Sequence, residues 1–85
     1  NNDITIEKAI LSANDISTID FSIKISGSTI GTITLSGESY KEDDILIGWS
    51  TNIASNTFLE FYVDNPAFCD SNMMVVILIL EIKIN

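Results

Sequence analysis

Apolar and polar residues alternate along much of this chain with a period of two, and this pattern constrains the fold more than any other feature. The clearest segment spans residues 16–26, in which Ile19, Phe21, Ile23 and Ile25 alternate with Asp20, Ser22, Lys24 and Ser26. Successive side chains of a β-strand point to opposite faces, so such a segment buries one face and exposes the other. Similar alternation predicts strands over residues 3–12 and 29–36. A short helix over residues 4–10 is an alternative for the first of these.

The composition favours the same fold class. Sixteen of the 85 residues are Ile and seven are Thr, whereas Gln and Arg are absent. β-Branched residues suit strands, and the Ser and Asn residues of this chain suit turns. A chain of this length has room for one small core. We therefore expect an all-β protein, a small antiparallel β-sandwich of jelly-roll character with six to seven strands, forming a single domain over residues 1–85.

The remaining elements follow from the turn-forming residues. Turns are predicted at residues 13–15 and 27–28, a polar loop at 37–44 and a longer loop at 65–72. Further strands are predicted over residues 45–49, 57–64 and 73–84, and a fragment of strand could form at 53–54. Gly31 is expected at a bulge or at a close approach of another group. Trp49 shares the parity of Ile45 and Ile47, and we expect it to cap the core.

Several functions are excluded or disfavoured by residues that the chain lacks. It has no His and one Cys, Cys69, so it cannot build a His-dependent catalytic site or a Cys-cluster metal site by itself. Four Lys, no Arg and a net charge of −8 leave little to bind phosphates, so neither nucleic acid nor an anionic membrane is an expected partner. The longest apolar run, eight residues, is too short for a membrane helix, and we expect no membrane insertion. We expect no enzyme activity, no cofactor and no metal.

Two weaker binding hypotheses concern loops and aromatic residues. Acidic residues at 42–44, together with Asp64, Asp70 and Asn72, could supply oxygen ligands to Ca²⁺, but no calcium-loop motif is present and such residues are usually only solvated. Four aromatic side chains could form a platform for a sugar: Tyr40, Trp49, Tyr62 and Phe68. Cys69 could pair with a second chain, or it could be an inert, half-buried residue.

The last predicted strand breaks the alternation, and this is the most informative departure. Residues 73–80 are apolar on both faces, and residues 58–63 are similar, with one Glu among them. The second face of each segment needs a cover, which could be the chain's own barrel closure or loop, or another protein. Large exposed apolar patches usually mark interfaces, and we favour an interface. The predicted interface residues are Ile4, Ile6, Phe58, Phe61, Tyr62, Met74, Val76, Leu78 and Leu80.

These features predict a protein that acts through its surfaces. The leading hypothesis is a structural subunit that self-assembles through β-strand surfaces into an extracellular filament, coat or appendage, as a homo-oligomer or filament. The two ends of the chain, residues 3–10 and 73–84, are the candidates for strand exchange. One alternative is a small acidic inhibitor or interaction module, of the kind a phage could encode, that occupies a basic groove on a partner protein. A carbohydrate-binding domain is another. An extracellular or surface location is expected from the Ser-, Thr- and Asn-rich composition and from the lack of an initial Met.

Overall fold

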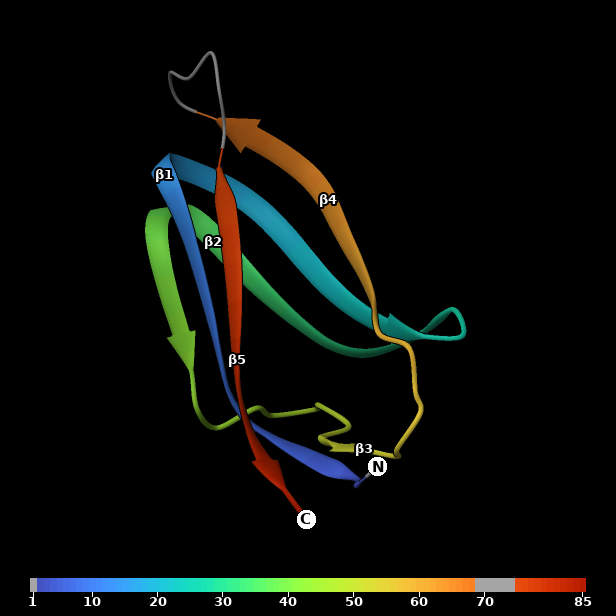
Figure 1. Ribbon diagram of the computed structural model, residues 1–85. Coiled ribbons are helices and arrows are strands. Elements are labelled where there is room, and N and C mark those ends of the chain that lie inside the picture. The colour runs from blue at the N-terminus through green and yellow to red at the C-terminus, as the bar shows by residue number, and fades with distance from the viewer. Residues whose placement is uncertain (1, 69–74) are drawn as a thin grey trace.

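The computed structural model describes residues 2–68 and 75–85, and within them the protein is all-β, with antiparallel strands and no helix (Figure 1). The strands are β1 (Ile4–Ile25), β2 (Ser28–Asp43), β3 (Asn52–Ile53), β4 (Glu60–Phe68) and β5 (Val76–Ile84). The all-β prediction is therefore confirmed. The short helix considered for residues 4–10 is wrong, because this segment is the start of β1.

The first two predicted strands are one continuous strand, β1, of 22 residues. The turn predicted at residues 13–15 is wrong, because the segment stays extended and the residues that flank it, Ser12 and Ser17, each pair with strands on both sides. It is nevertheless irregular: β1 has four residues between Ser12 and Ser17, whereas β2 has only Ser39 between the residues that pair with them, Tyr40 and Glu38. An excess of residues on one strand bends and twists it. Turn-forming residues have here produced a bend within a strand.

All other strands pair with β1. The tight turn at Ser26 and Gly27 joins β1 to β2, and both turn residues have positive φ values, 50° and 81°. A two-residue turn of this kind matches the twist of a hairpin. β2 pairs with both halves of β1. On the other edge of β1, β5 pairs with the first half and β4 pairs with the second half. The two-residue β3 pairs with Ile4 and Thr5 on the same edge as β2.

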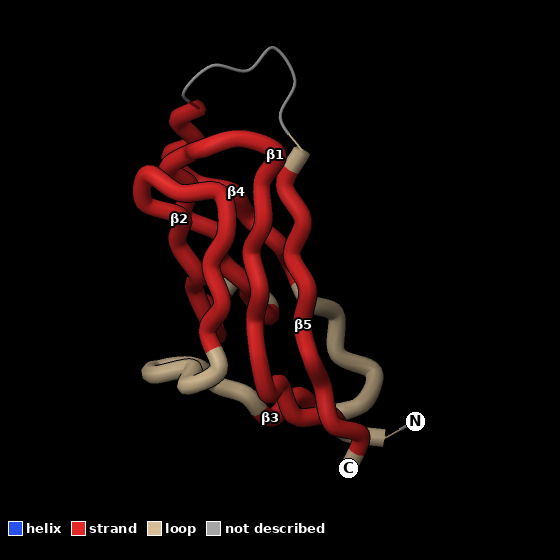
Figure 2. Tube along the Cα trace, turned by 90° about the vertical axis from the view of Figure 1, so that its left-hand side faces the viewer, coloured by secondary structure: helices blue, strands red, loops and turns tan. Residues whose placement is uncertain are grey.

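The bend brings the two halves of the sheet to face one another around one core (Figures 1 and 2). Alternate side chains of β1 and β2 fill this core, and Leu46 and Ile53 add to it. Its buried hydrophobic members are Ile6, Ala9, Leu11, Ile19, Ile23, Ile30, Ile33, Leu35, Leu46 and Ile53. The molecule is elongated, with extents of 42 × 23 × 21 Å. The core therefore lies between the two halves of the bent β1–β2 sheet, and side chains of β5 pack against its margin.

Two other sequence predictions are corrected. Residues 37–43 belong to β2 and not to a loop, because they pair with both the first half and the bend of β1. Residues 45–49 form turns and not a strand: Asp43 Oδ1 accepts hydrogen bonds from the backbone N–H groups of Ile45 and Leu46, which ends β2. Leu46 has a φ of 56° and its side chain enters the core.

The segments around β4 and β5 also differ from the predicted bounds. β4 begins at residue 60 instead of 57 and continues to residue 68, through part of the predicted loop. β5 begins at residue 76. The rest of the predicted loop, with Met73 and Met74, lies outside the described residues. The strand fragment predicted near residue 53 is confirmed as β3.

Candidate interaction surface

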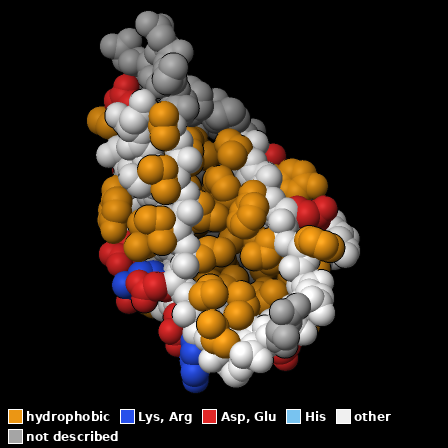
Figure 3. Space-filling model, in the orientation of Figure 1, with side chains coloured by type: hydrophobic (Ala, Val, Ile, Leu, Met, Phe, Trp, Pro, Cys, Tyr) orange, Lys and Arg blue, Asp and Glu red, His pale blue; other side chains and the backbone are white. Residues whose placement is uncertain are grey.

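An apolar groove opens between β4 and β5, and it is the main hollow on the face shown in Figure 3. Its volume is about 470 Å³, and Phe21, Phe61, Leu78 and Leu80 line it. Leu78 and Leu80 come from β5, Phe61 from β4, and Phe21 from the second half of β1 between them. In Figure 3 hydrophobic side chains fill the floor of the groove and its two walls. The groove is an extension of the core to the surface.

The strand registers explain why these side chains point into the groove. Phe61 lies opposite Ile23, and Leu78 lies opposite Leu11. Directly opposite residues of paired strands share a face of the sheet, and both Ile23 and Leu11 are core residues. Phe61 and Phe21 also contact each other, with ring centroids 6.1 Å apart. Yet the side chain of Phe61 remains 52% exposed, because no further strand covers it in the described structure.

Both walls of the groove end in an unpaired strand edge. Among residues 2–68 and 75–85, β4 and β5 each pair with β1 and with no other strand. The opposite edge of each therefore presents backbone N–H and C=O groups that the sheet does not use. An exposed edge of this kind can accept another strand. The groove and the two edges together form a surface suited to an extended peptide.

A second apolar surface lies on the outer face of β5. Val75, Ile77 and Ile79 point away from the core, and Ile77 and Ile79 are 51% and 50% exposed. Ile79 lies opposite Ile10 of β1, which adds to the same face. We call Val75, Ile77 and Ile79 the outer patch. The predicted interface residues of this strand, Val76, Leu78 and Leu80, lie on its opposite face, although the lack of alternation indicates apolar side chains on both faces.

The predicted interface residues lie in different places. Phe61, Leu78 and Leu80 line the groove, and Val76 packs against the core on the same side. Ile6 is in the core and Ile4 packs against it, since the first half of β1 lies between β2 or β3 and β5. Tyr62 lies on the outer face of β4, where the Lys24 ammonium is 4.5 Å from the centre of its ring. Met74 is outside the described residues.

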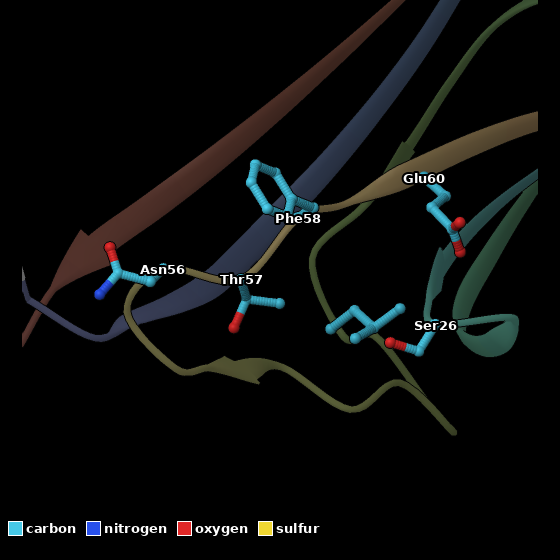
Figure 4. A pocket seen from close by; sticks show the side chains of 6 residues that line it. Ser26, Asn56, Thr57, Phe58 and Glu60 are labelled. Atoms are coloured by element: carbon cyan, nitrogen blue, oxygen red, sulfur yellow. The ribbon is translucent and has the colours of Figure 1, made fainter.

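Phe58 lies away from the groove, in the segment that leads to β4, and is 89% exposed. It borders a second cavity of about 430 Å³, with Ile25, Ser26, Asn56, Thr57 and Glu60. Figure 4 shows these side chains around the opening between this segment and the β1–β2 turn. Glu60 Oε1 accepts a hydrogen bond of 3.0 Å from the Gly27 backbone N–H. This carboxylate thus holds the turn against the start of β4.

Charged groups lie outside the groove. Lys8 Nζ is 3.0 Å from Glu42 Oε1 and 3.6 Å from Glu81 Oε2, so it joins β1 to β2 and β5 on the outer face. The hydrogen bond from Lys8 to Glu42, with the charges of Glu42 and Glu81, raises the pKa of Lys8 above its usual value of 10.5. The strand register therefore gives β5 one ionic attachment to the sheet in addition to its backbone hydrogen bonds.

Some residues of the calcium and sugar hypotheses have structural partners. Glu42 pairs with Lys8 and Asp43 ends β2, as described above. In the described part of the chain no three acidic or Cys side chains gather closely enough to hold a metal ion. Asp70 and Asn72 lie outside that part. Trp49 packs its ring directly on Gly31 and against the core, which confirms both the close approach at Gly31 and the capping by Trp49.

Comparison with known proteins provides no relative for this chain: no protein-family model matches it, and neither a curated protein nor a solved structure matches it significantly. A search of the described residues for a helix both long and apolar enough to cross a membrane finds none. The surface described above is therefore the basis for a functional interpretation.

Proposed function

We propose that this protein is a non-enzymatic structural subunit that self-assembles through β-strand surfaces into an extracellular filament, coat or appendage. In this proposal the chain is a small β-sandwich domain of jelly-roll character that lacks a strand along one side. The observation that carries it is the apolar groove between the unpaired edges of β4 and β5.

Apolar side chains on this side of the sheet stay partly exposed. Phe61 and Val63 on β4, and Ile82 on β5, lie opposite core-facing residues of β1 yet are 46–52% exposed. Fully burying one such side chain contributes about 1.5–3 kcal/mol, so covering its exposed half contributes roughly 1 kcal/mol. Several such side chains lie on this side of the sheet. A partner that covers all of them at once gains the sum of these contributions.

A β-strand suits this groove better than a compact ligand does. A strand that enters the groove can form a ladder of backbone hydrogen bonds with an edge while alternate side chains contact the apolar floor. A small apolar molecule could contact the floor but could not pair with the edges. The four Lys and net charge of −8 also disfavour anionic ligands. These features favour a polypeptide partner. Another copy of the same chain is such a partner, and its local concentration is high within an assembly.

Measurement of particle mass and shape tests the proposal. Sedimentation velocity over a range of protein concentrations, with electron microscopy of the same samples, should show oligomers, rings or filaments. A monomer at every concentration, pH and salt condition would contradict self-assembly. A monomer that binds a basic protein, with affinity that falls as salt rises, would support the acidic inhibitor instead. Selective binding on a glycan array would support a carbohydrate-binding domain.

A further inference from the structure

We infer that the first contact between copies is made by β5, which pairs antiparallel with β5 of a second copy about a two-fold axis at Ile79. This inference rests on the proposed self-assembly and names the strand that begins it. It depends on a difference in charge and in backbone donors between the two unpaired edges, which would otherwise be equivalent.

The β4 edge carries features that oppose pairing with another copy. Its sequence contains Glu60 and Asp64 and no basic residue, so two copies that meet along β4 would bring four carboxylates together. It also contains Pro66, which has no backbone N–H to donate to a ladder. Charges and proline on an edge strand are the usual means by which β-proteins prevent association. The β4 edge is therefore protected.

The β5 edge carries neither form of protection. It has no Pro, and its two charged residues, Glu81 and Lys83, sum to zero. Two copies can therefore meet along β5 without net repulsion between the two strands, even though each chain carries a net charge of −8. The residues of β5 before Glu81 are all apolar. An exposed edge strand that begins with five apolar residues and has no net charge is the site at which a second strand adds most readily.

Charge and face also favour a register with an apolar centre. The outward side chains of both copies must lie on the same face of the joined sheet. A shift of one copy by one residue would place its outer patch on the face that carries the core-side residues of the other copy. A two-fold axis at Glu81 would set Glu81 directly opposite the partner's Glu81, which is unfavourable. An axis at Ile79 sets Ile79 opposite the partner's Ile79 and Leu78 opposite the partner's Leu80. Glu81 then lies opposite the partner's Ile77, so the centre is apolar and the charges flank it.

This pairing joins the two outer patches into one apolar surface and extends the β5 wall of each groove by a strand. Antiparallel pairing of one strand with its own copy is isologous, so the contact closes as a dimer. The protected β4 edges and the grooves stay available for further contacts. The dimer is then the building block of any larger assembly.

Two sets of variants test the contact and its register. The substitution Ile79→Lys places a charge at the axis, on a half-exposed side chain, and should raise the concentration at half-association about ten-fold or more. Ile47→Lys, an equal charge change on an exposed turn residue, should leave the association unchanged. Far-UV circular dichroism checks that both variants keep their β-structure.

Cysteine pairing locates the axis without relying on a loss of association. In a chain that carries Cys69→Ser, Ile79→Cys places the two sulfur atoms in directly opposite positions, within the range of a disulfide. Ile77→Cys is the matched control on the same strand and face. Its two copies would lie about four residues apart along the strands, roughly 14 Å, which is too far for a disulfide. We expect an intermolecular disulfide with Ile79→Cys and none with Ile77→Cys.

The outcomes separate this inference from the proposed function. Association that Ile79→Lys does not weaken, together with no disulfide for Ile79→Cys, would overturn the β5 contact while self-assembly stands. A disulfide at residue 77 and none at residue 79 would overturn the register. A wild-type chain that stays monomeric under all conditions would overturn both proposals.

Discussion

β4 and β5 are two nine-residue strands that both pair only with β1 in the described structure, yet their exposed edges differ in chemistry. β4 carries two acidic residues and a proline, and its outer face includes Tyr62 beneath the Lys24 ammonium. β5 carries balanced charges, and its outer face includes two half-exposed isoleucines. Identical topology therefore produces one edge that resists association and one that permits it. The difference lies in the residues that each strand carries, because both strands attach to β1 in the same way.

The largest expected effect separates the two faces of β5. Leu78 packs against the core, so Leu78→Glu places a charge in an apolar setting and should lower the free energy of unfolding by several kcal/mol. Ile77→Glu, the same substitution one residue earlier, faces outward and should leave the fold intact while it weakens association. Urea unfolding followed by circular dichroism, together with sedimentation, measures both effects. Unfolding by both variants would show that the outer patch is covered within the monomer.

The next effect concerns pH and salt. Twelve acidic residues against four Lys repel copies of the chain at pH 7, whereas the net charge approaches zero near the isoelectric point of about 4.1. Association through the β5 edge, which has no net charge, should therefore strengthen as the pH falls from 7 towards 4. Added salt at pH 7 should reproduce part of this effect by screening. Light scattering over a grid of pH and salt measures it, and association that weakens with salt would instead indicate attraction between charges.

A smaller effect is expected when the protection of β4 is reduced. Glu60→Gln with Asp64→Asn removes both charges of this strand, and the new amide at position 60 keeps an oxygen that can accept the hydrogen bond from the Gly27 N–H. Association should increase slightly, since Pro66 still interrupts the edge. Glu7→Gln with Asp44→Asn is the control, because it removes the same charge elsewhere. Equal gains in sedimentation for both pairs would mean that only net charge matters, and that the two edges do not differ.

The smallest effect concerns the ionic attachment of β5. Lys8→Met removes the contacts with Glu42 and Glu81 and should slightly lower stability at pH 7, because these are exposed ion pairs. Because folding raises the pKa of Lys8, the ion pairs stabilise the folded state fully below the unfolded pKa. This stabilisation is lost as the pH rises through the folded pKa. Urea midpoints of wild type and variant should therefore converge above pH 10.5. Lys41→Met serves as the control, and a difference that persists at high pH would contradict an ionic origin.

The faces of β5 show how far sequence reasoning reaches. The lack of alternation over residues 73–80 correctly indicates that this strand has apolar side chains on both faces, and Leu78 shares one groove with Phe61 of β4. Which parity faces the core depends on the register with β1, which pairs Leu11 with Leu78. Register is a long-range property, since these residues are far apart in the chain. The outward position of Ile77 and Ile79 therefore could not be derived from local pattern.

The sequence by itself determined the fold class, the core-facing alternation of residues 19–25, a close approach at Gly31 and the capping of the core by Trp49, because local side-chain pattern and steric freedom control them. That Trp49 is the group that approaches Gly31 is a tertiary finding. Only the tertiary structure decided that residues 13–16 bend a continuous strand instead of ending one, because the residues that flank the bend, Ser12 and Ser17, each pair with strands on both sides. It also decided that β4 and β5 lie on the same edge of β1 in different halves of the sheet. That arrangement places an apolar groove between two free edges, and such an arrangement arises from pairings between residues distant in sequence.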